Sequence, residues 1–578
     1  MSGWSAPTRD TLFVLNDVLK ISDCELPGYD QLDEDTVEAV VEGMGKFCAE
    51  VLAPLNPVSD AQGCIRHEDG SVSTPEGFRE AYAQLIESGW NTIASPAAFG
   101  GQGMGHVLGT VFEEYMNSAC AGFMMYPGIV GGATSTIISA GSDELKEAYV
   151  EKIVSGEYLA TMALTEGHAG TDLGLMRTKA EPQGDGSHAI TGEKIFISGG
   201  EHDLTENIVH LVLAKLPDAP AGSRGISLFL VPKILPDGSR NAVSCASIEH
   251  KMGLNGSATC VMNFDGAKGR LLGKEHGGLA AMFIMMNAAR LAVGVQGLAH
   301  AEHAYQRAAA YALERKQGRG MGERADPSAA ADSLLVHPDV RRMLMDARAF
   351  AEGFRTLVLW TAMEIDRAHA GDREADALVS FLTPVIKAYG SDRGFETAVE
   401  MQQVLGGHGY VKEWGMEQIV RDARIAMIYE GANGVQALDL AGRKLAKDGG
   451  AVAMRFAALV EADLKHAPEW IAEPMARAVG DTREAARWML ENAGEDPNTL
   501  GAASYAFLEM IGVVAIGWMW VRMADVVEAR DDGFAEAKRI TARHYAQATL
   551  PLTSSLRAKI EGGAQNLMAL PEDAFLRA

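Results

Sequence analysis

The feature that most constrains the fold of this chain is a change in hydrophobic period along its length. Up to about residue 160, segments such as 35–51 and 143–155 carry apolar residues three or four positions apart, the spacing of amphipathic helices. Between about 161 and 282 the apolar segments are short, rich in β-branched and aromatic residues, and bounded by turn formers, which indicates strands at 188–198, 207–216, 225–233 and 258–266. Helical spacing returns from about 283. This order predicts an α+β fold and argues against a doubly wound nucleotide-binding fold.

The same pattern divides the chain of 578 residues into four expected domains. Their boundaries are 1–160 for an N-terminal helical domain, 161–282 for a middle β-barrel or β-sandwich domain, 283–447 for a helical bundle, and 448–578 for a helical appendage. The glycine cluster at 99–105 lacks the GxGxxG spacing and is expected to form a loop. The apolar run Met510–Val521 is too short to span a bilayer and predicts a buried helix.

Charge and cysteine content exclude several classes of protein. A formal net charge of −26 repels the phosphates of nucleic acids and anionic membrane surfaces, although local arginines still allow a phosphorylated ligand. The six cysteines are scattered without a CxxC pair or a Cys/His cluster, so we expect reduced thiols, no metal site and a cytoplasmic protein. The N-terminus has no basic segment followed by an apolar core, and so resembles neither a signal peptide nor a transit peptide.

The most informative short segment is Tyr429-Glu430-Gly431, which lies between two helix-like runs. It offers one carboxylate beside an aromatic ring and a glycine. Mostly apolar neighbours disfavour the charged form and are expected to raise the pKa of Glu430, as a proton-abstracting base near neutral pH requires. Taken alone, a glutamate beside a glycine is more often a solvated helix end than a catalyst, so the assignment depends on the segments upstream.

Two upstream segments have the character of a ligand-binding surface. Residues 162–172 (MALTEGHAGTD) form a glycine-rich turn whose N–H groups and hydroxyls suit a flat heterocycle and a pyrophosphate. The alternative is a helix-to-strand turn capped by Thr165. Taken alone, residues 194–200 (KIFISGG) predict a strand whose residues alternate between buried and exposed, ending in a turn. In that strand Phe196 also offers a ring for stacking, and Ser198 offers a hydroxyl for a hydrogen bond.

Two further segments offer contacts to phosphate. Arg290, in the sequence NAAR, and Arg315, at the end of a long helix expected over 291–314, carry the planar donor fork that binds two phosphate oxygens. The alternative for each is a surface ion pair one helical turn away. In residues 403–410 (QVLGGHGY) the glycines allow close approach of the backbone to a ligand. We expect His408 in that turn to be a packing or capping residue.

In this order and at comparable spacing, the segments resemble the motifs of the acyl-CoA dehydrogenase family, flavoenzymes that oxidise acyl-CoA thioesters. The resemblance covers about residues 35–445 and extends more loosely over the appendage, as in the long bacterial members that include the 3-(methylthio)propanoyl-CoA dehydrogenases. It implies an N-terminal helical domain, a middle β domain and a C-terminal four-helix bundle, followed by an extra helical domain.

The resemblance implies FAD as the cofactor and an acyl-CoA as the substrate. The residues that match cofactor-binding positions of the family are Met162, Leu164, Thr165, Gly170, Phe196, Ser198, Arg315, Gln403, Gly406, Gly407 and Asn433. Those that match substrate-binding positions are Thr171, Asn287, Arg290 and Gly431. The sequence departs from the family pattern with Gly167 for a proline, Gly318-Arg319 for Phe-Gly, and Ala432 and Gly434 for a threonine and a glutamine.

The reaction implied by the resemblance is α,β-dehydrogenation. A base removes the α-proton of the thioester while the β-hydrogen leaves as hydride to flavin N5, giving a trans-2-enoyl-CoA. We expect Glu430 to be the base. Some members of the family place this glutamate directly before the arginine matched by Arg290, but the residue there is Ala289. Glu430 is therefore the one carboxylate at either position.

The leading hypothesis is a dehydrogenase that passes electrons to an electron-transfer flavoprotein and acts on a short acyl chain such as 3-(methylthio)propanoyl. The alternatives are a medium- or long-chain dehydrogenase and an acyl-CoA oxidase, which uses O₂. A nitroalkane-oxidising relative prefers aspartate as the base, so Glu430 counts against it. The acidic net charge counts against a DNA-binding relative of the fold. We expect a homo-oligomer, with a dimer favoured over a tetramer.

Overall fold

The structure is a computed structural model that describes residues 4–322, 327–494 and 496–576. The chain forms two compact units. One contains Gly3–Ala6 and Val40–Ala292, and we call it the β unit; the other contains Pro7–Ala39 and Val293–Ala578, and we call it the helical unit. The sequence assigned residues 7–39 to the N-terminal helical domain, whereas they pack within the helical unit. The four expected domain boundaries stay a prediction.

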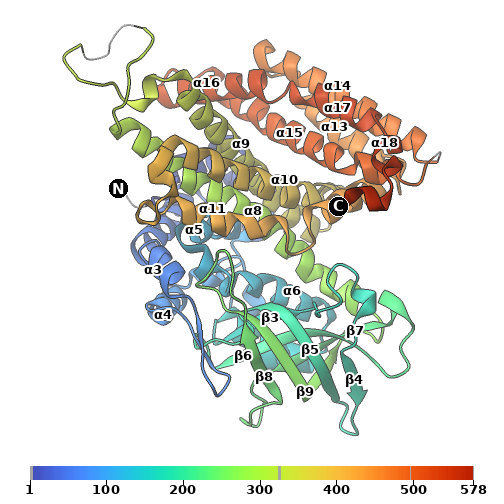
Figure 1. The fold of residues 1–578 in the computed structure, drawn as a ribbon. Coiled ribbons are helices and arrows are strands. Elements are labelled where there is room, and N and C mark those ends of the chain that lie inside the picture. The colour runs from blue at the N-terminus through green and yellow to red at the C-terminus, as the bar shows by residue number, and fades with distance from the viewer. Residues whose placement is uncertain (1–3, 323–326, 495, 577–578) are drawn as a thin grey trace. The chain divides into compact units, whose positions relative to one another are not determined.

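A single sheet of seven strands forms the centre of the β unit (Figure 1). Its strands are β3 (Tyr158–Ala163), β4 (Lys179–Pro182), β5 (His188–Ser198), β6 (Asn207–Lys215), β7 (Ile226–Pro232), β8 (Val243–Ile248) and β9 (Thr259–Leu272). The order is β3-β6-β4-β5-β9-β7, with β8 paired to β9. Because β7 also pairs with β6, the sheet closes on itself as a barrel does. The strands expected at 188–198, 207–216, 225–233 and 258–266 are confirmed.

The two ligand-binding segments lie at the ends of β3 and β5, two strands that are not paired with each other in the sheet. β3 runs parallel to β6, with Tyr158 opposite Asn207, and β5 runs antiparallel to β9. β6 and β7 are buried almost throughout, as expected of apolar, β-branched strands covered on both faces. A backbone hydrogen bond from Ile195 N to Thr165 O, 2.8 Å long, joins the chain after β3 to β5.

Most helices of the β unit precede the sheet in sequence. They are the part of α2 (Glu34–Phe47) from Val40 onward, α3 (Leu55–Gln62), α4 (Phe78–Ser88), α5 (Gly105–Met124), α6 (Val130–Ala140) and α7 (Asp143–Val154), with a short hairpin of β1 (Ile65–Arg66) and β2 (Val72–Ser73) after α3. Ser142 caps α7 by accepting a hydrogen bond from Leu145 N. The glycine cluster forms the loop before α5, as expected. At Gly101 a Cβ would lie 2.0 Å from the Ser95 carbonyl oxygen, so only glycine fits there.

Long helices build the bundle. α8 (Gly278–Glu314) begins in the β unit and continues into the helical unit, followed by α9 (Pro338–His369) and α10 (Arg373–Leu405). α8 starts thirteen residues before the expected Leu291, at Gly278, because Met282 and Met285 extend its buried face. Pro338 occupies the first turn of α9, and Asp372 caps α10 through the Glu374 and Ala375 N–H groups.

The appendage is helical throughout and packs on the bundle within the helical unit (Figure 1). It contains α13 (Ala451–Asp463), α14 (Glu469–Asn492), α15 (Thr499–Glu528), α16 (Gly533–Ala548), α17 (Leu552–Glu561) and α18 (Gln565–Ala569). α15 is its central helix, with every residue from Met510 to Val521 buried, which confirms the expected core helix. α8 and α15 are long and apolar enough to cross a membrane, but both contribute to the protein core.

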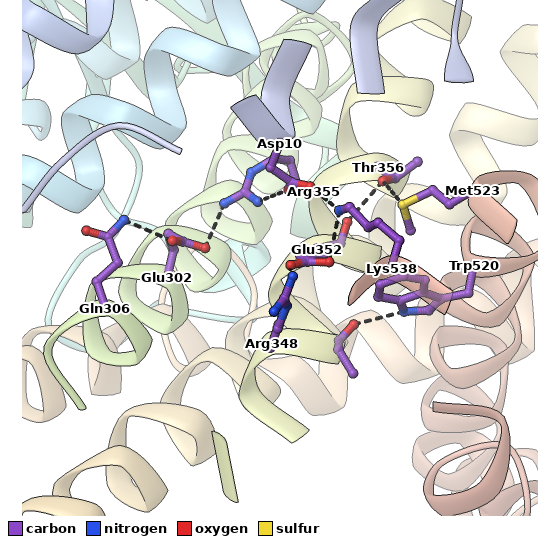
Figure 2. Close-up of polar contacts among 11 residues, drawn as sticks. Asp10, Glu302, Gln306, Arg348, Glu352, Arg355, Thr356, Trp520, Met523 and Lys538 are labelled. Atoms are coloured by element: carbon purple, nitrogen blue, oxygen red, sulfur yellow. Dashed lines mark hydrogen bonds and ion pairs between the residues drawn. The ribbon is translucent and has the colours of Figure 1, made fainter. Parts of the chain in front are cut away.

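A buried network of charges ties the N-terminal segment, the bundle and the appendage together (Figure 2). Arg355 on α9 pairs with Glu302 on α8 at 2.8 Å and with Asp10 on α1 (Thr8–Leu12). Lys538 on α16 pairs with Glu352 on α9 at 2.9 Å and also with Asp10. Burial alone would raise the pKa of Asp10, but Lys538 and Arg355 lower it. These pairs explain why residues 7–39 belong to the helical unit.

Candidate active site

The predicted functional residues fall on both units. The β unit carries Met162, Leu164, Thr165, Gly170, Thr171, Phe196, Ser198, Asn287 and Arg290. The helical unit carries Arg315, Gln403, Gly406, Gly407, Glu430, Gly431 and Asn433. Within each unit, the fold brings together residues that lie far apart in the sequence.

Glu430 lies in a short connection between a 3₁₀ turn (Arg424–Met427) and α12 (Asn433–Leu438). Its side chain is half-buried, so it is not the fully solvated helix end that was the alternative. The backbone of Glu430 is left-handed, with φ of 55°, and that of Gly431 follows with φ of 86°. A glutamate in this conformation costs roughly 1–2 kcal/mol, and such strain persists where neighbouring contacts impose it.

Two buried glutamines hold the backbone and the aromatic neighbour of Glu430. On one side, the Gln436 Nε2 of α12 donates to the Gly431 carbonyl oxygen at 3.2 Å. On the other side, the Tyr429 hydroxyl donates to the Gln296 side-chain oxygen on α8. Burial, together with the nearby charge of Glu430, raises the pKa of Tyr429 and keeps the phenol protonated. Tyr429 therefore anchors Glu430 as a neutral hydrogen-bond donor.

Asn433, at the start of α12, is buried and its amide binds protein groups. Its oxygen accepts from Lys387 Nζ at 2.7 Å, and its nitrogen donates to Ser391 Oγ at 2.9 Å and to Asp392 Oδ1 at 2.7 Å. All three partners lie on α10. The FAD contact expected of Asn433 stays a prediction, and the amide would have to leave these partners to make it.

On the β unit, a buried ion pair fixes the chain that follows β3. Lys194 on β5 is fully buried and donates to Leu164 O and to Glu166 Oε1, both at 2.9 Å. Glu166 also accepts from Thr178 Oγ1 at 2.6 Å. Burial opposes the charge of Glu166, yet Lys194 and these donors lower its pKa to about 2. No sequence motif marks this pair, although Glu166 and Lys194 stand inside the two ligand-binding segments.

Phe196 presents its ring to solvent beside this ion pair. Its φ is 59° and its side chain is 59% exposed, an unusual combination for an aromatic residue in a strand. The cause is a register shift between Lys194 and Ile197 in the pairing of β5 with β9, which turns the ring away from the core. Ser198 follows at the end of β5, half-buried.

The residues expected beside Phe196 come from the end of β3. Met162 is the last but one residue of the strand, and Leu164 and Thr165 follow it, all three half-buried. Thr165 thus lies two residues after the end of a strand and caps no helix, so the alternative of a helix-to-strand turn is wrong. Gly170 and Thr171 lie further along the turn and are exposed.

Arg290 and Asn287 are one turn apart on α8. The Arg290 guanidinium donates to Asn287 Oδ1 at 3.2 Å and lies 5.7 Å from the centroid of the Phe283 ring. Arg290 is only 8% exposed, so it is not the surface ion pair that was its alternative. A buried guanidinium with an aromatic neighbour is suited to an anionic ligand.

The glycine turn lies at the end of α10, against the C-terminal end of α8. Gln403, Gly406 and Gly407 are exposed, and no atom lies within 4 Å of a Cβ built at either glycine. The His408 ring stacks on Trp414 at 4.2 Å, and its Nδ1 is 2.9 Å from the Tyr311 hydroxyl on α8. His408 therefore has the packing role that we expected.

Four consecutive stretches of the chain match the domains of one family. They correspond to the acyl-CoA dehydrogenase N-terminal domain (residues 34–157), middle domain (161–267) and C-terminal domain (276–445), and to a domain described as acetyl-CoA dehydrogenase C-terminal like (454–571). The chain belongs to the acyl-CoA dehydrogenase family and is an oxidoreductase. The fold class expected from the sequence, with an extra C-terminal helical region, is confirmed.

Among its curated relatives is a 3-methylmercaptopropionyl-CoA dehydrogenase from Ruegeria pomeroyi, 42% identical over 98% of this chain and 99% of the relative. A broad-specificity linear acyl-CoA dehydrogenase, FadE5 of Mycobacterium tuberculosis, is 34% identical over 100% of this chain and 100% of the relative.

Solved structures share the fold at lower identity. Caenorhabditis elegans ACDH-11, crystallised with C11-CoA, is 17% identical with a TM-score of 0.76 over 95% of this chain and 93% of that one. A Bacillus anthracis acyl-CoA dehydrogenase complexed with FAD is 20% identical with a TM-score of 0.75, covering 92% and 88%. Both matches extend over the appendage as well as the bundle.

Proposed function

We propose that this chain uses FAD to oxidise an acyl-CoA thioester to a trans-2-enoyl-CoA, with Glu430 as the base. The observation that carries the proposal is the conformation of Glu430: a half-buried carboxylate on a left-handed backbone, held by α12 on one side and by Tyr429 on the other. A general base must be fixed within hydrogen-bond reach of the proton that it removes.

Each unit by itself carries residues whose chemistry suits a part of FAD. In the β unit, the exposed Phe196 ring and the Thr165 and Ser198 hydroxyls, with Met162 and Leu164, suit a flat ring system. In the helical unit, the exposed Arg315 guanidinium and the open backbone of Gly406 and Gly407, with Gln403, suit the adenosine diphosphate part. When bound, FAD supplies the hydride acceptor of the reaction.

The protein must make a weakly acidic carbon give up its proton. Glu430 takes the α-proton, and the charge that develops on the thioester oxygen needs a donor in a site without water. We assign this donor to the Glu430 N–H, since a fixed donor of this kind is worth about 3 kcal/mol in the transition state. Thr171, Asn287, Arg290 and Gly431 are assigned to CoA and the thioester.

A short-chain substrate has the best support. Relatives that match the chain over its length include the 3-methylmercaptopropionyl-CoA enzyme and a butyryl-CoA dehydrogenase from Syntrophomonas wolfei, 30% identical over 98% of this chain. We propose 3-(methylthio)propanoyl-CoA and butyryl-CoA as the first substrates to test. We further propose a cytoplasmic homodimer that passes its electrons to an electron-transfer flavoprotein. An oxidase would instead form hydrogen peroxide when substrate and O₂ are the only additions.

The decisive experiment is anaerobic bleaching of the flavin absorbance with a panel of acyl-CoA thioesters. We expect the wild-type protein to bleach with short acyl chains and Glu430→Gln to bind FAD equally well but bleach at least 1,000-fold more slowly, because an amide cannot take the proton. Glu413→Gln, an exposed glutamate in the same unit, is the matched control and should behave as wild type. Near-normal bleaching by Glu430→Gln would remove the assignment of the base.

A further inference from the structure

A hydrogen-bonded chain leads from the appendage to the segment that carries Glu430. The Tyr505 hydroxyl on α15 donates to Asp392 Oδ2 on α10 at 2.6 Å. The other oxygen of the same carboxylate, Oδ1, accepts from Asn433 Nδ2 on α12 at 2.7 Å. One residue from the appendage, one from the bundle and one from the helix after Glu430 are therefore joined through a single carboxylate.

Asn433 fixes the position of α12, and α12 fixes the backbone beside Glu430. α12 contains only six residues, so contacts with its neighbours decide its position because so short a helix has little stability of its own. Asn433 is 4% exposed, and its amide binds three side chains of α10. Three residues later, Gln436 donates to the Gly431 carbonyl oxygen. A shift of Asn433 would therefore move the support under Glu430 and Gly431.

Asp392 needs both of its donors. Burial raises the pKa of Asp392, and the hydrogen bonds from Tyr505 and Asn433 oppose this rise. Burial and the nearby carboxylate also raise the pKa of Tyr505, so the phenol remains a donor. A partly buried carboxylate that loses one donor either takes up a proton or draws in its remaining donor. Either response reaches Asn433 directly, because Asn433 is that remaining donor.

We propose that Tyr505 and Asp392 are positioning residues that act through Asn433 to hold Glu430 in its reactive backbone conformation. The proposal rests on the function proposed above, in which Glu430 is the base. It makes the appendage a part of the catalytic apparatus as well as a cover for the bundle. The contact of α15 with α12 then also has a role in positioning Glu430. The two helices meet at Leu438, the last residue of α12, and Gly501, near the start of α15.

Tyr505→Phe tests the proposal, since it removes one hydroxyl and keeps the ring. Tyr505 is 40% exposed, so we expect the folded protein to survive with a thermal midpoint within about 2 °C of wild type. Flavin reduction by saturating acyl-CoA should slow about tenfold, with little change in the concentration of substrate needed for half-saturation. The pH profile of the reduction rate should also shift, because the surroundings of the Glu430 carboxylate change. Hydrogen exchange of the amides of residues 430–436 should accelerate about tenfold in the protein as purified.

His544→Gln is the matched control. His544 on α16 contacts Asp346 at 2.7 Å and so joins the appendage to α9 instead of α10. It should leave the exchange of residues 430–436 and the rate and pH profile of flavin reduction unchanged. A double variant, Tyr505→Phe with Asn433→Ala, should be no slower than Asn433→Ala alone, because both changes act on one path.

Three results would overturn the proposal. The first is that the amides of residues 430–436 exchange in Tyr505→Phe at the wild-type rate. The second is that Tyr505→Phe and His544→Gln slow flavin reduction equally. The third is that the double variant is slower than Asn433→Ala by the full factor that Tyr505→Phe causes alone. Failure of the proposed function looks different, because the wild-type protein itself would then fail to bleach with any acyl-CoA. In that case the exchange measurement still decides whether Tyr505 orders residues 430–436.

Discussion

Glu430 and Phe196 share a backbone conformation that residues with a Cβ seldom adopt, with φ of 55° and 59°. Each is held there by buried polar contacts close by: Gln436 beside Glu430, and Lys194 two residues before Phe196. Strain of this kind concentrates at functional positions, because selection for folding alone would place glycine there. We assign the base of the reaction to Glu430 and the ring that stacks on the cofactor to Phe196.

Phe196→Gly should therefore stabilise the protein and weaken FAD binding. Glycine adopts a positive φ without cost, and a ring that is 59% exposed loses little burial when it is removed. We expect the free energy of unfolding of the FAD-free protein to rise by about 1 kcal/mol. Phe196→Ala removes the ring but keeps the strain, so the difference between the two variants in urea unfolding isolates the backbone term. A Phe196→Gly variant about 0.5–1 kcal/mol less stable than Phe196→Ala would show that the conformation is not strained, because that difference is the ordinary entropic cost of glycine.

At the scale of the element, the end of β3 and the bulge of β5 form one rigid surface. Lys194 crosses from β5 to Leu164 O and Glu166, and Ile195 N bonds to Thr165 O. Residues 162–165 and 196–198 are thereby fixed to each other, although Lys194 follows Leu164 by 30 residues in the chain. In the sequence, each of the two segments could equally be a turn or a strand with no ligand. The hydrogen bonds between them show that the side chains of Met162, Leu164, Thr165 and Ser198 belong to one surface.

Lys194→Met should loosen that surface. The change leaves the Glu166 carboxylate buried without its ion partner, which costs about 3–5 kcal/mol of unfolding free energy. Adding Glu166→Gln removes the uncompensated charge and should recover roughly 1–2 kcal/mol. Lys268→Met is the control, since its pair with Asp185 is about half exposed and should contribute less than 1 kcal/mol. Urea denaturation measures all four proteins, and an equal effect of the two lysine changes would contradict the role of Lys194.

At the scale of the whole molecule, the helical unit combines three stretches of sequence around buried charges. Asp10, Arg355 and Lys538 come from the N-terminal segment, the bundle and the appendage, and the Asp10 carboxylate pairs with both of the buried cations (Figure 2). Gly353 on α9 shows how closely the helices approach, since a Cβ there would lie 2.6 Å from Ile516 and Trp520 of α15. The appendage is thus a structural partner of the bundle along the length of α15.

Buried histidines in both units predict that the protein loses stability in mild acid. Burial, with a smaller contribution from the nearby Lys233 cation, lowers the pKa of His202 and His210 to about 3. Burial alone lowers the pKa of His300 to about 4. The unfolded chain takes up these protons from about pH 6.5 downward, whereas the folded chain stays neutral, so stability falls as pH falls from about 6.5 towards 4. Each histidine should remove about 1 kcal/mol between pH 7 and 5.5.

His300→Gln tests this pH dependence. It should flatten the fall of the unfolding free energy in that window by about 1 kcal/mol, and the exposed His250→Gln should not change it. Urea denaturation at pH 7, 6.5, 6 and 5.5 gives the slope. A slope that is the same in His300→Gln as in the wild-type protein would contradict the assignment of the buried, neutral imidazole.

Much of the fold was readable from the sequence, because hydrophobic period and turn residues act locally. The β5 strand lies at the residues expected, and the core helix around Met510–Val521 is buried as its composition predicts. The location of Glu430 was also readable, since its neighbours carry a family motif. What local pattern could not give was the start of α8, which depends on burial of Met282 and Met285 against other elements.

The amino-acid sequence by itself determined the order of helical and strand segments, the family, and the single carboxylate at the position of the base. Only the tertiary structure decided the left-handed backbone of Glu430, the outward ring of Phe196, and the engagement of Asn433 with α10. The reason is physical: composition and period record what each residue prefers near its neighbours in the chain. Strain and buried hydrogen bonds are imposed by partners such as Lys194, Asp392 and Tyr505, which the fold brings from distant parts of the sequence.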